Sequence, residues 1–196
     1  VNDEMSLRNR MSYTDAQFNR DLNVIKNIFK SSGFYFAKID SSITKDEKLN
    51  AIKLTINIDK GERAKIKEIV FIGDKKIKDK KLLEVITSEE HKFWKFISNK
   101  VFLNESLINL DQRLLTNYYR NLGYYKVKIL NSFAELKQNN SFKIIYNIDA
   151  GEKYFFNDFN LNLPSDYEEK DFDQIKKIFS KLKGSIYTLD NLNLIL

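Results

Sequence analysis

The sequence has no cysteine and only one proline, one histidine and one tryptophan among its 196 residues. Without cysteine the chain can form no disulfide and no thiolate metal site, and cysteine usage gives no information about its redox compartment. No apolar run approaches the roughly 20 residues that a membrane-spanning helix needs. No charged segment followed by an apolar stretch opens the sequence. We therefore expect no targeting peptide here, and expect any membrane contact of the protein to lie outside this sequence.

Residue types that carry chemistry are also scarce. None of the six glycines belongs to a phosphate-binding pattern of the G-x-G-x-x-G or G-x-x-x-x-G-K-[ST] type. His91 lies in a loop of acids and lysines, where we expect a solvated side chain and not a catalytic base. The acids of the two NID-x-GE segments, at 57–62 and 147–152, are explained by turn formation. We predict no catalytic residue, no cofactor and no metal site, and so a protein that is not an enzyme.

What is present indicates a folded chain with an excess of positive charge. Apolar residues make up 42% and aromatic residues 13% of the sequence, and the formal net charge is +6. A basic chain invites a nucleic-acid interpretation. The lysines, however, are interleaved with acids, as in the segment DKKIKDKKLLE, and form no single stripe. We expect no nucleic-acid partner.

The dominant feature is an internal repeat with an offset of 90 residues and no gaps. Residues 16–62 align with residues 106–152, and each copy ends in the same NID-x-GE block. A fixed period of this kind indicates a string of similar modules. Identities between the copies include Asn19/Asn109, Asp21/Asp111, Asn27/Asn117, Gly33/Gly123, Tyr35/Tyr125, Lys38/Lys128, Ile39/Ile129, Ser42/Ser132, Asn50/Asn140 and Lys53/Lys143.

One complete copy predicts a β-α-α-β-β module. The spacing of apolar residues predicts the strand 64–73, the short helix 78–87, a longer helix from Asn104 as N-cap to Gly123, the strand 124–135 and the strand 141–149. Phe142, Ile144, Tyr146 and Ile148 should share the inner face of the last strand. The predicted class is α+β, with tandem modules that each consist of a three-stranded sheet and two helices on one face.

The flanking copies are partial. The first should contain a helix that starts at a capping box of Thr14 and Gln17, followed by a hairpin of strands 34–44 and 51–59. The third should contain an opening strand at 154–163, a helix at 167–182 and a second helix from Thr188. We expect its phenylalanines 155, 156 and 159 to find no cover within the chain, and so to be mobile or to pack against another copy.

The second strand of the complete module is the candidate binding site. If the last two strands form a hairpin and the first strand joins the other side of the last one, the second strand is a free edge. A free edge can accept an extended peptide by main-chain pairing. Along it, the pattern predicts positions 125, 127 and 129 inward, positions 124, 126 and 128 outward, and a bulge near 131–132. The candidate residues are Tyr124, Tyr125, Lys126, Val127, Lys128, Ile129, Asn131 and Phe133.

A second candidate is the aromatic loop 92–96. Phe93, Trp94 and Phe96 lie between lysines, and bulky aromatic residues in a loop form either a small core of their own or a contact surface. We expect the small core, and keep Phe93 and Trp94 as a candidate contact loop.

The modules resemble a known family. The motif N-Y-Y-x-x-x-G-Y-Y at 117–125 and the segment with Ile148, Gly151 and Glu152, together with the β-α-α-β-β order, are similar to tandem POTRA modules of the BamA family of outer-membrane β-barrel assembly factors. The aromatic loop resembles that of the third module in that family. The resemblance implies the boundaries 1–62 for the C-terminal half of one module, 63–151 for a complete module that resembles the third, and 152–196 for the N-terminal part of the next.

The resemblance also implies a function. It implies the periplasmic portion of an outer-membrane protein, a scaffold that binds unfolded outer-membrane β-barrel clients and accessory lipoproteins by β-augmentation. Membrane contact would be made through a C-terminal barrel absent from this sequence. The alternatives are a related TamA-like or two-partner-secretion transporter, a POTRA module of a cell-division protein, which usually occurs singly, and a basic α/β nucleic-acid-binding module.

Overall fold

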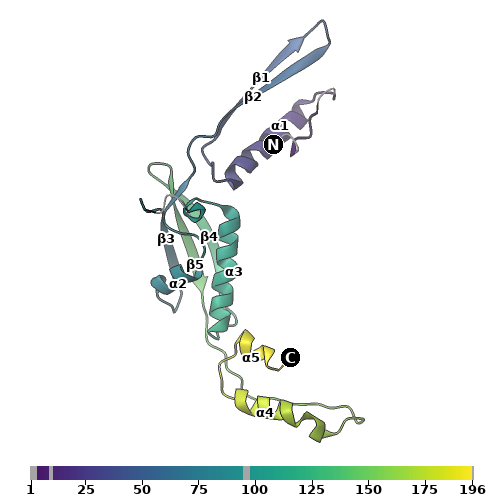
Figure 1. Cartoon of the computed structure of the whole chain (residues 1–196), viewed down its shortest axis with the longest axis vertical. Coiled ribbons are helices and arrows are strands. Elements are labelled where there is room, and N and C mark those ends of the chain that lie inside the picture. The colour runs from purple at the N-terminus through teal and green to yellow at the C-terminus, as the bar shows by residue number, and fades with distance from the viewer. Residues whose placement is uncertain (1–3, 9–10, 95–97, 196) are drawn as a thin grey trace. The chain divides into compact units, whose positions relative to one another are not determined.

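The computed structural model describes residues 4–8, 11–94 and 98–195 (Figure 1). Its class is α+β, as the sequence predicts. The main elements are α1 (Asp15–Ser31), β1 (Lys38–Asp46), β2 (Ala51–Asp59), β3 (Lys65–Asp74), α2 (Asp79–Val85), α3 (Glu105–Asn121), β4 (Lys128–Lys137), β5 (Ser141–Asp149), α4 (Asp173–Leu182) and α5 (Leu189–Asn193). Short 3₁₀ turns occur at Asn99–Val101 and Glu169–Phe172.

By its internal contacts the chain divides into two compact units. One consists of residues 1–68, 88–108 and 135–143, and the other of residues 69–87, 109–134 and 144–196. The three-stranded sheet has the order β3-β5-β4, and a separate two-stranded sheet has the order β1-β2. The predicted strand order of the complete module is therefore confirmed.

The first unit begins with α1, which starts where the sequence predicts. The Thr14 side chain accepts a hydrogen bond from the main-chain N–H of Gln17 at 3.3 Å, which satisfies one of the free donors of the first turn. Gly33 ends the helix region at φ +89°, where a side chain would be strained. The hairpin that follows pairs β1 with β2 in antiparallel register from Lys38 opposite Asp59 to Asp46 opposite Ala51.

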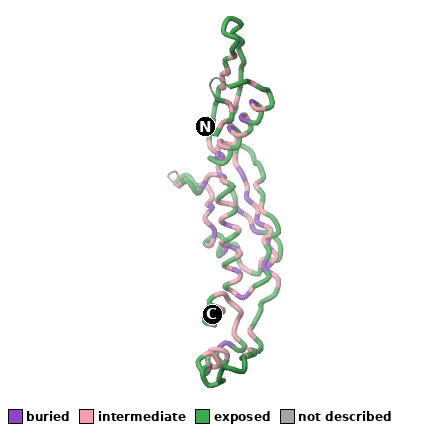
Figure 2. Tube along the Cα trace, turned by 90° about the vertical axis from the view of Figure 1, so that its right-hand side faces the viewer, coloured by how far each residue is buried: buried purple, intermediate pink, exposed green. Residues whose placement is uncertain are grey.

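The core of the second unit combines side chains from β5, β3 and α3. Buried side chains alternate along β5, as the sequence predicts. Within this unit Tyr146 stacks on Phe71 at a ring-centroid distance of 5.6 Å. Figure 2 shows buried positions interspersed with intermediate and exposed ones along the chain trace. From α3, Leu115 and Tyr119 have no exposed surface. Because these positions are four residues apart, they lie on one stripe of the helix. Other buried members of this core are Ile69, Leu82, Ile144 and Ile148.

Two sequence predictions for the last segment are wrong. Residues 154–163 form no strand, because Phe155 makes only an isolated antiparallel bridge with Ile186. The predicted helix 167–182 begins as α4 only at Asp173, after the 3₁₀ turn. The start of the last helix is right, since the side chain of Thr188 caps α5 by accepting from the N–H of Asn191 at 3.0 Å.

The phenylalanines of this segment are also better covered than expected. Phe159 stacks on Phe179 of α4 with centroids 4.5 Å apart, and Phe156 lies 5.0 Å from the ring of Tyr187. Only Phe155 is largely exposed. The expectation that all three lack cover within the chain is therefore wrong for Phe156 and Phe159.

Candidate functional site

Strand β4 is an edge strand. In the part of the chain that the structure describes, β5 is the only strand that pairs with it, and no hydrogen bond from outside the sheet reaches a main-chain group of Lys128–Lys137. An edge of this kind presents a row of unpaired N–H and C=O groups. The strand can therefore accept a further strand by main-chain pairing.

The other edge of the same sheet, β3, is covered at its start. The main-chain N–H of His91 donates to the carbonyl of Ile66 at 2.7 Å. The N–H of Leu103 donates to the carbonyl of Ala64 at 2.8 Å. These contacts take up the outward carbonyl groups where β3 begins, so an added strand would have to displace them.

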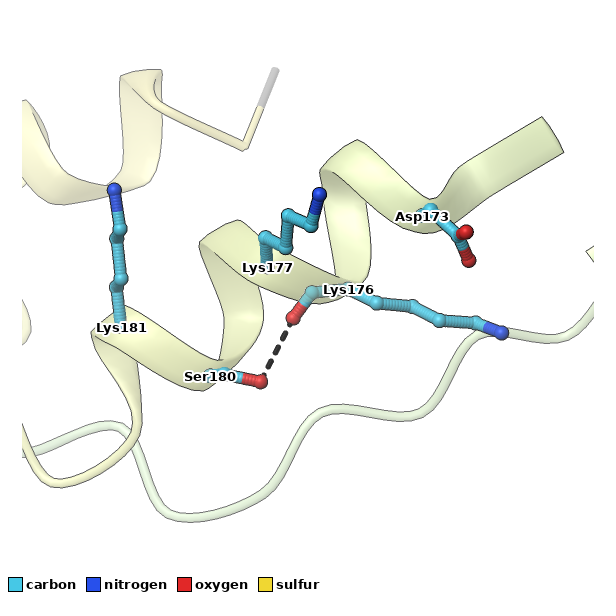
Figure 3. A pocket seen from close by; sticks show the side chains of 5 residues that line it. All are labelled: Asp173, Lys176, Lys177, Ser180 and Lys181. Atoms are coloured by element: carbon cyan, nitrogen blue, oxygen red, sulfur yellow. Dashed lines mark hydrogen bonds between the residues drawn. The ribbon is translucent and has the colours of Figure 1, made fainter. Parts of the chain in front are cut away.

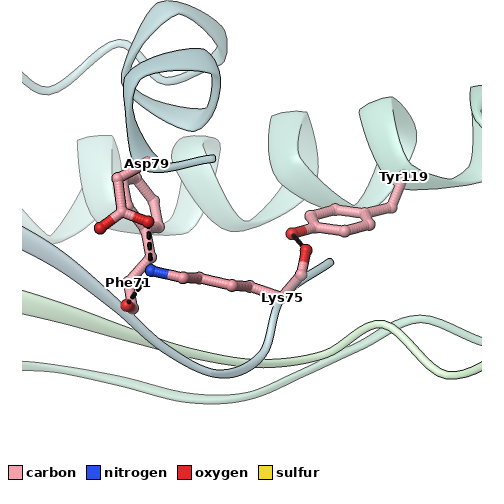
Figure 4. A network of polar contacts seen from close by, with 4 residues as sticks. All are labelled: Phe71, Lys75, Asp79 and Tyr119. Atoms are coloured by element: carbon pink, nitrogen blue, oxygen red, sulfur yellow. Dashed lines mark hydrogen bonds and ion pairs between the residues drawn. The ribbon is translucent and has the colours of Figure 1, made fainter. Parts of the chain in front are cut away.

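Further along, the second half of β3 is covered by side chains (Figure 4). The Lys75 ammonium donates to the carbonyl of Phe71 at 3.1 Å and forms an ion pair with Asp79. The hydroxyl of Tyr119 donates to the Lys75 carbonyl. Burial, followed by the neighbouring Tyr124 hydroxyl, raises the pKa of Tyr119, so this hydroxyl keeps its proton. The contrast between the two edges singles out β4 within this sheet.

The side chains of β4 are unevenly buried. Leu130 and Phe133 are 55% and 47% exposed, and large apolar side chains on an edge strand offer contacts to a partner. Ile129, Ser132 and Ala134 are partly covered. The burial phase changes between 129 and 132, where the sequence predicts a bulge. Gln112 of α3 donates to the hydroxyl of Ser132, which ties this part of the strand to the helix.

Four of the eight predicted edge residues lie outside the strand. Tyr124 to Val127 form a turn after α3, in which the N–H of Val127 donates to the carbonyl of Tyr124 at 3.1 Å. The predicted inward position of Tyr125 is wrong, because 44% of its surface is exposed. Its ring instead lies 5.0 Å from that of Tyr187. Lys126 hydrogen-bonds to Tyr154, which raises the lysine's pKa.

The remaining four predicted residues, Lys128, Ile129, Asn131 and Phe133, lie on β4. Since β4 has no second partner strand in the described residues, these four remain candidate binding residues. We therefore restrict the candidate site to these four residues and add Leu130, because its side chain is exposed on the same strand.

The aromatic loop does not form a small core at the residues that can be described. Phe93 is 83% and Trp94 59% exposed, and their rings contact each other edge to face at 4.5 Å. The expected core is therefore wrong for these two. Phe96 lies outside the described residues.

Two carboxylates with no predicted role are buried at equivalent positions of the repeat. Asp111 has no exposed surface and accepts hydrogen bonds from the N–H of Thr87 at 2.6 Å and the hydroxyl of Tyr146 at 2.8 Å. Asp21, 2% exposed, accepts from the N–H groups of Ser6 and Leu7 at 2.8 and 2.9 Å. Each carboxylate thus holds the segment that precedes its helix.

Concave surfaces occur on α4 and beside the start of β3. One, lined by Asp173, Lys176, Lys177, Ser180 and Lys181, is formed by the exposed side chains of α4 alone (Figure 3). Lys176 is already paired with Glu169 at 2.7 Å. Within residues 4–8, 11–94 and 98–195, no group of three or more acids and histidines could hold a metal ion. In the same residues, no helix combines the length and the apolar character needed to cross a bilayer.

Similar α+β units repeated at a fixed offset define a modular repeat protein. A profile of the POTRA family, described as the surface antigen variable number repeat, matches residues 1–61 and 64–151. The chain therefore belongs to the POTRA family, as the sequence resemblance implies.

Relatives with this family's modules are outer-membrane assembly factors. The chain is 23% identical over 184 residues to outer membrane protein assembly factor BamA of Neisseria meningitidis serogroup B, covering 94% of this chain and 23% of that protein. The BamA of Buchnera aphidicola is 21% identical over 153 residues, covering 76% of this chain and 23% of that protein. Among solved structures, Haemophilus influenzae BamA POTRA3-5 is 16% identical with a TM-score of 0.48, covering 98% of this chain and 74% of that one. The chain thus spans less than a quarter of the curated relatives' length.

Proposed function

We propose that this chain is part of a periplasmic scaffold of an outer-membrane protein assembly machine. In this proposal it binds unfolded β-barrel clients, and accessory lipoproteins of the complex, by adding a strand of the partner to β4. The supporting observation is the contrast between the two edges of one sheet. The described residues provide no outer partner for β4, whereas β3 is covered at Ala64, Ile66 and Phe71. The similarity to BamA proteins supports the cellular setting.

The energetics fit a transient scaffold. A main-chain hydrogen bond contributes only about 0.5–1.5 kcal/mol net, so a short added strand binds weakly. Exposed Leu130 and Phe133 add apolar contact without demanding a particular client sequence. Weak, sequence-tolerant binding lets a client be held and then released, and several modules acting together supply the affinity. We propose the module boundaries 1–62, 63–151 and 152–196 for such a series.

The test is an NMR titration of the chain with an extended peptide taken from a barrel strand. We expect the largest shifts in Lys128–Phe133. The hairpin β1–β2 also has edges without a strand partner in the described residues, so it provides an internal comparison. Shifts confined to α3, or to β1 and β2, would contradict the assignment of the site.

Proline substitutions at two neighbouring positions separate edge binding from folding. Successive N–H groups of a strand point to opposite sides, so of Lys128→Pro and Ile129→Pro one removes an outward donor and the other a donor to β5. The variant that loses an outward N–H should lose peptide binding with a small change in stability. The variant that loses a donor to β5 should destabilise the module. If both variants bind the peptide as well as the unmodified chain, main-chain pairing at β4 is excluded.

A pair of leucine substitutions tests how much the exposed side chain of Leu130 contributes to peptide binding. Leu130→Ser should weaken peptide binding about tenfold, as expected for loss of roughly 1.4 kcal/mol of apolar contact. Leu49→Ser changes the same residue type at the tip of the first hairpin, where it is 75% exposed, and should have no effect.

A further inference from the structure

A basic pocket shares no residue with the candidate site on β4; it lies where β3 begins and the β4–β5 turn approaches it. The pocket has a volume of about 620 Å³ and lies wholly within the first compact unit. Three lysines and the only histidine of the chain line it, and no carboxylate among the described residues does. The lining residues are Lys65, Lys67, His91, Lys137, Gln138, Asn139 and Ser141.

The fold holds these groups together. The loop that carries His91 is fixed to β3 by the hydrogen bond from its N–H to the Ile66 carbonyl. The β4–β5 turn is fixed by Asn139 and Asn140, which adopt left-handed φ values of +58° and +52°, as the sequence predicts for these residues. The pocket is therefore a product of two defined backbone segments and not of a single solvated helix face.

The positive charge of the pocket is only partly compensated. Among the described residues neither Lys65 nor Lys67 has an ion-pair partner, whereas Lys137 is paired with Glu135 at 2.7 Å. The two acids that precede His91, Glu89 and Glu90, already have interaction partners. An anion in the pocket would therefore meet at least two uncompensated ammonium groups.

Two exposed aromatic residues follow the pocket's histidine in the chain. Phe93 and Trp94 follow His91 and Lys92 in the chain, and the Lys92 ammonium lies 5.7 Å from the centre of the Trp94 ring. Tryptophan flanked by lysine is typical of surfaces that lie at the boundary between lipid headgroups and acyl chains, because the ring is amphipathic and the ammonium pairs with phosphate.

We propose that the basic pocket and the Phe93–Trp94 loop together bind the anionic phospholipid surface of a membrane, which revises the expectation that any membrane contact lies outside this sequence. The lysines pair with lipid phosphates, and the two rings enter the headgroup region. A dissolved phosphate would use the lysines alone and would leave two large aromatic side chains in water. The membrane surface uses both halves of the feature, which is why we favour it as the occupant.

Trp94 is the only tryptophan of the chain, so its fluorescence reports on this loop alone. We expect its emission to shift to shorter wavelength when vesicles of phosphatidylglycerol and phosphatidylcholine are added to the protein at low salt. Vesicles of phosphatidylcholine alone, and dissolved glycerol phosphate, should leave the emission unchanged. An unchanged emission with the anionic vesicles overturns the proposal, as does an equal shift with glycerol phosphate or with a single-stranded oligonucleotide.

The variants separate this surface from the general positive charge of the chain. Lys65→Gln with Lys67→Gln should lower the apparent vesicle affinity about 25-fold, since each lysine near an anionic surface contributes about a factor of five. Lys177→Gln with Lys181→Gln removes the same charge from α4 and should leave the affinity within about twofold. Phe93→Ser should weaken binding while Trp94 remains as the reporter. An equal loss in the two double variants would show attraction by net charge only, and would overturn the assigned site.

This proposal does not depend on peptide binding at β4. The lysine variants should bind the barrel-strand peptide like the unmodified chain. The peptide titration therefore tests the β4 site, and the vesicle experiment separately tests the membrane surface.

Discussion

The main-chain N–H of Tyr154 donates a hydrogen bond of 2.9 Å to the carbonyl of Gly123, the glycine that follows α3. Ninety residues earlier, the N–H of Ala64 donates to the carbonyl of Gly33 at 2.8 Å. The offset of the sequence repeat is therefore also the offset of a structural joint. In both copies the residue five positions after the closing strand donates to the glycine that follows the long helix.

In each copy a second main-chain hydrogen bond belongs to the joint. Leu103 donates to the Ala64 carbonyl, and Tyr187 donates to the Tyr154 carbonyl, each at 2.8 Å. Both donors directly precede the capping residue of the next helix, Asn104 or Thr188. The joint thus connects the end of one helix to the start of the next through two main-chain bonds.

Gly123→Ala tests this joint. Gly123 has φ +93°, and an added Cβ would lie 2.3 Å from the Cγ2 atom of Ile186. We expect a loss of about 2–3 kcal/mol in unfolding free energy, in which left-handed backbone strain contributes about 1–2 kcal/mol and the clash the rest. Urea unfolding measures it. Gly151→Ala is the matched control, because Gly151 is also left-handed but has nothing within 4 Å of the added Cβ.

Adding Ile186→Ala to Gly123→Ala tests whether the contact between the new Cβ and Ile186 causes the loss of stability. In Gly123→Ala with Ile186→Ala the space for the new Cβ is restored, so the double variant should be more stable than the sum of the two single losses predicts. Strict additivity would show that the strain lies in the backbone alone.

Asp111→Ala should strongly destabilise the second unit. The substitution leaves the N–H of Thr87 and the hydroxyl of Tyr146 without their buried acceptor, at a cost of about 3–5 kcal/mol for a lost charged acceptor. Tyr146→Phe removes only one donor and should cost about 1.5–3 kcal/mol. A double-variant cycle by urea unfolding measures the coupling. A coupling near zero would show that the 2.8 Å contact contributes nothing in solution.

The equivalent carboxylate in the first copy predicts a pH dependence. Burial raises the pKa of Asp21, but hydrogen bonds from the main chain of Ser6 and Leu7 and from the Ser6 hydroxyl, with a further effect of Arg8, lower it more. The folded-state pKa is thus below the unfolded value. The stabilisation is complete above the unfolded pKa and is lost as pH falls toward the folded one.

We therefore expect the attachment of Ser6 and Leu7 to weaken in acid, as seen in the hydrogen exchange of their amides. Ser6→Ala should raise the pKa of Asp21 in an NMR titration, since it removes one donor to the carboxylate. Asp21→Asn should abolish the acid dependence. An Asp21 pKa at or above its ordinary value would contradict the predicted direction.

Much of the fold follows from local signals in the sequence. The caps at Thr14 and Asn104 are formed by side chains within three residues, so the sequence suffices to locate them. The inner face of β5 follows from strict alternation, because its two faces differ in burial along the whole strand. The sheet order follows from connectivity, since a hairpin and a two-helix crossover leave few arrangements.

The wrong strand predictions concern segments that would need a neighbouring strand to pair with. Residues 124–127 alternate like a strand but satisfy their main chain in a turn, through the bond from Val127 to Tyr124. Residues 154–163 have strand-like composition, yet a strand requires a neighbour, and the described residues offer only the bridge at Phe155. Alternation alone does not reveal either outcome.

For the candidate site, the sequence predicts the edge strand but does not single out Leu130, one of its exposed apolar residues. The buried carboxylates were visible as the identity Asp21/Asp111 but received no role. The signal lay in their spacing, because Asp111 is four residues before Leu115 on the apolar stripe of α3. A carboxylate in that position must be buried and therefore needs donors.

The open edge also predicts self-association of the isolated chain. An edge strand with exposed apolar side chains can pair with a second copy. Leu130→Lys should reduce the weight-average mass at high concentration in sedimentation equilibrium, with an association constant about tenfold lower, because a lysine at the edge disfavours pairing. Leu49→Lys adds the same charge at the tip of the first hairpin and should change association only slightly, since Leu49 lies in the turn between β1 and β2. If both variants suppress association equally, net charge and not the β4 edge controls it.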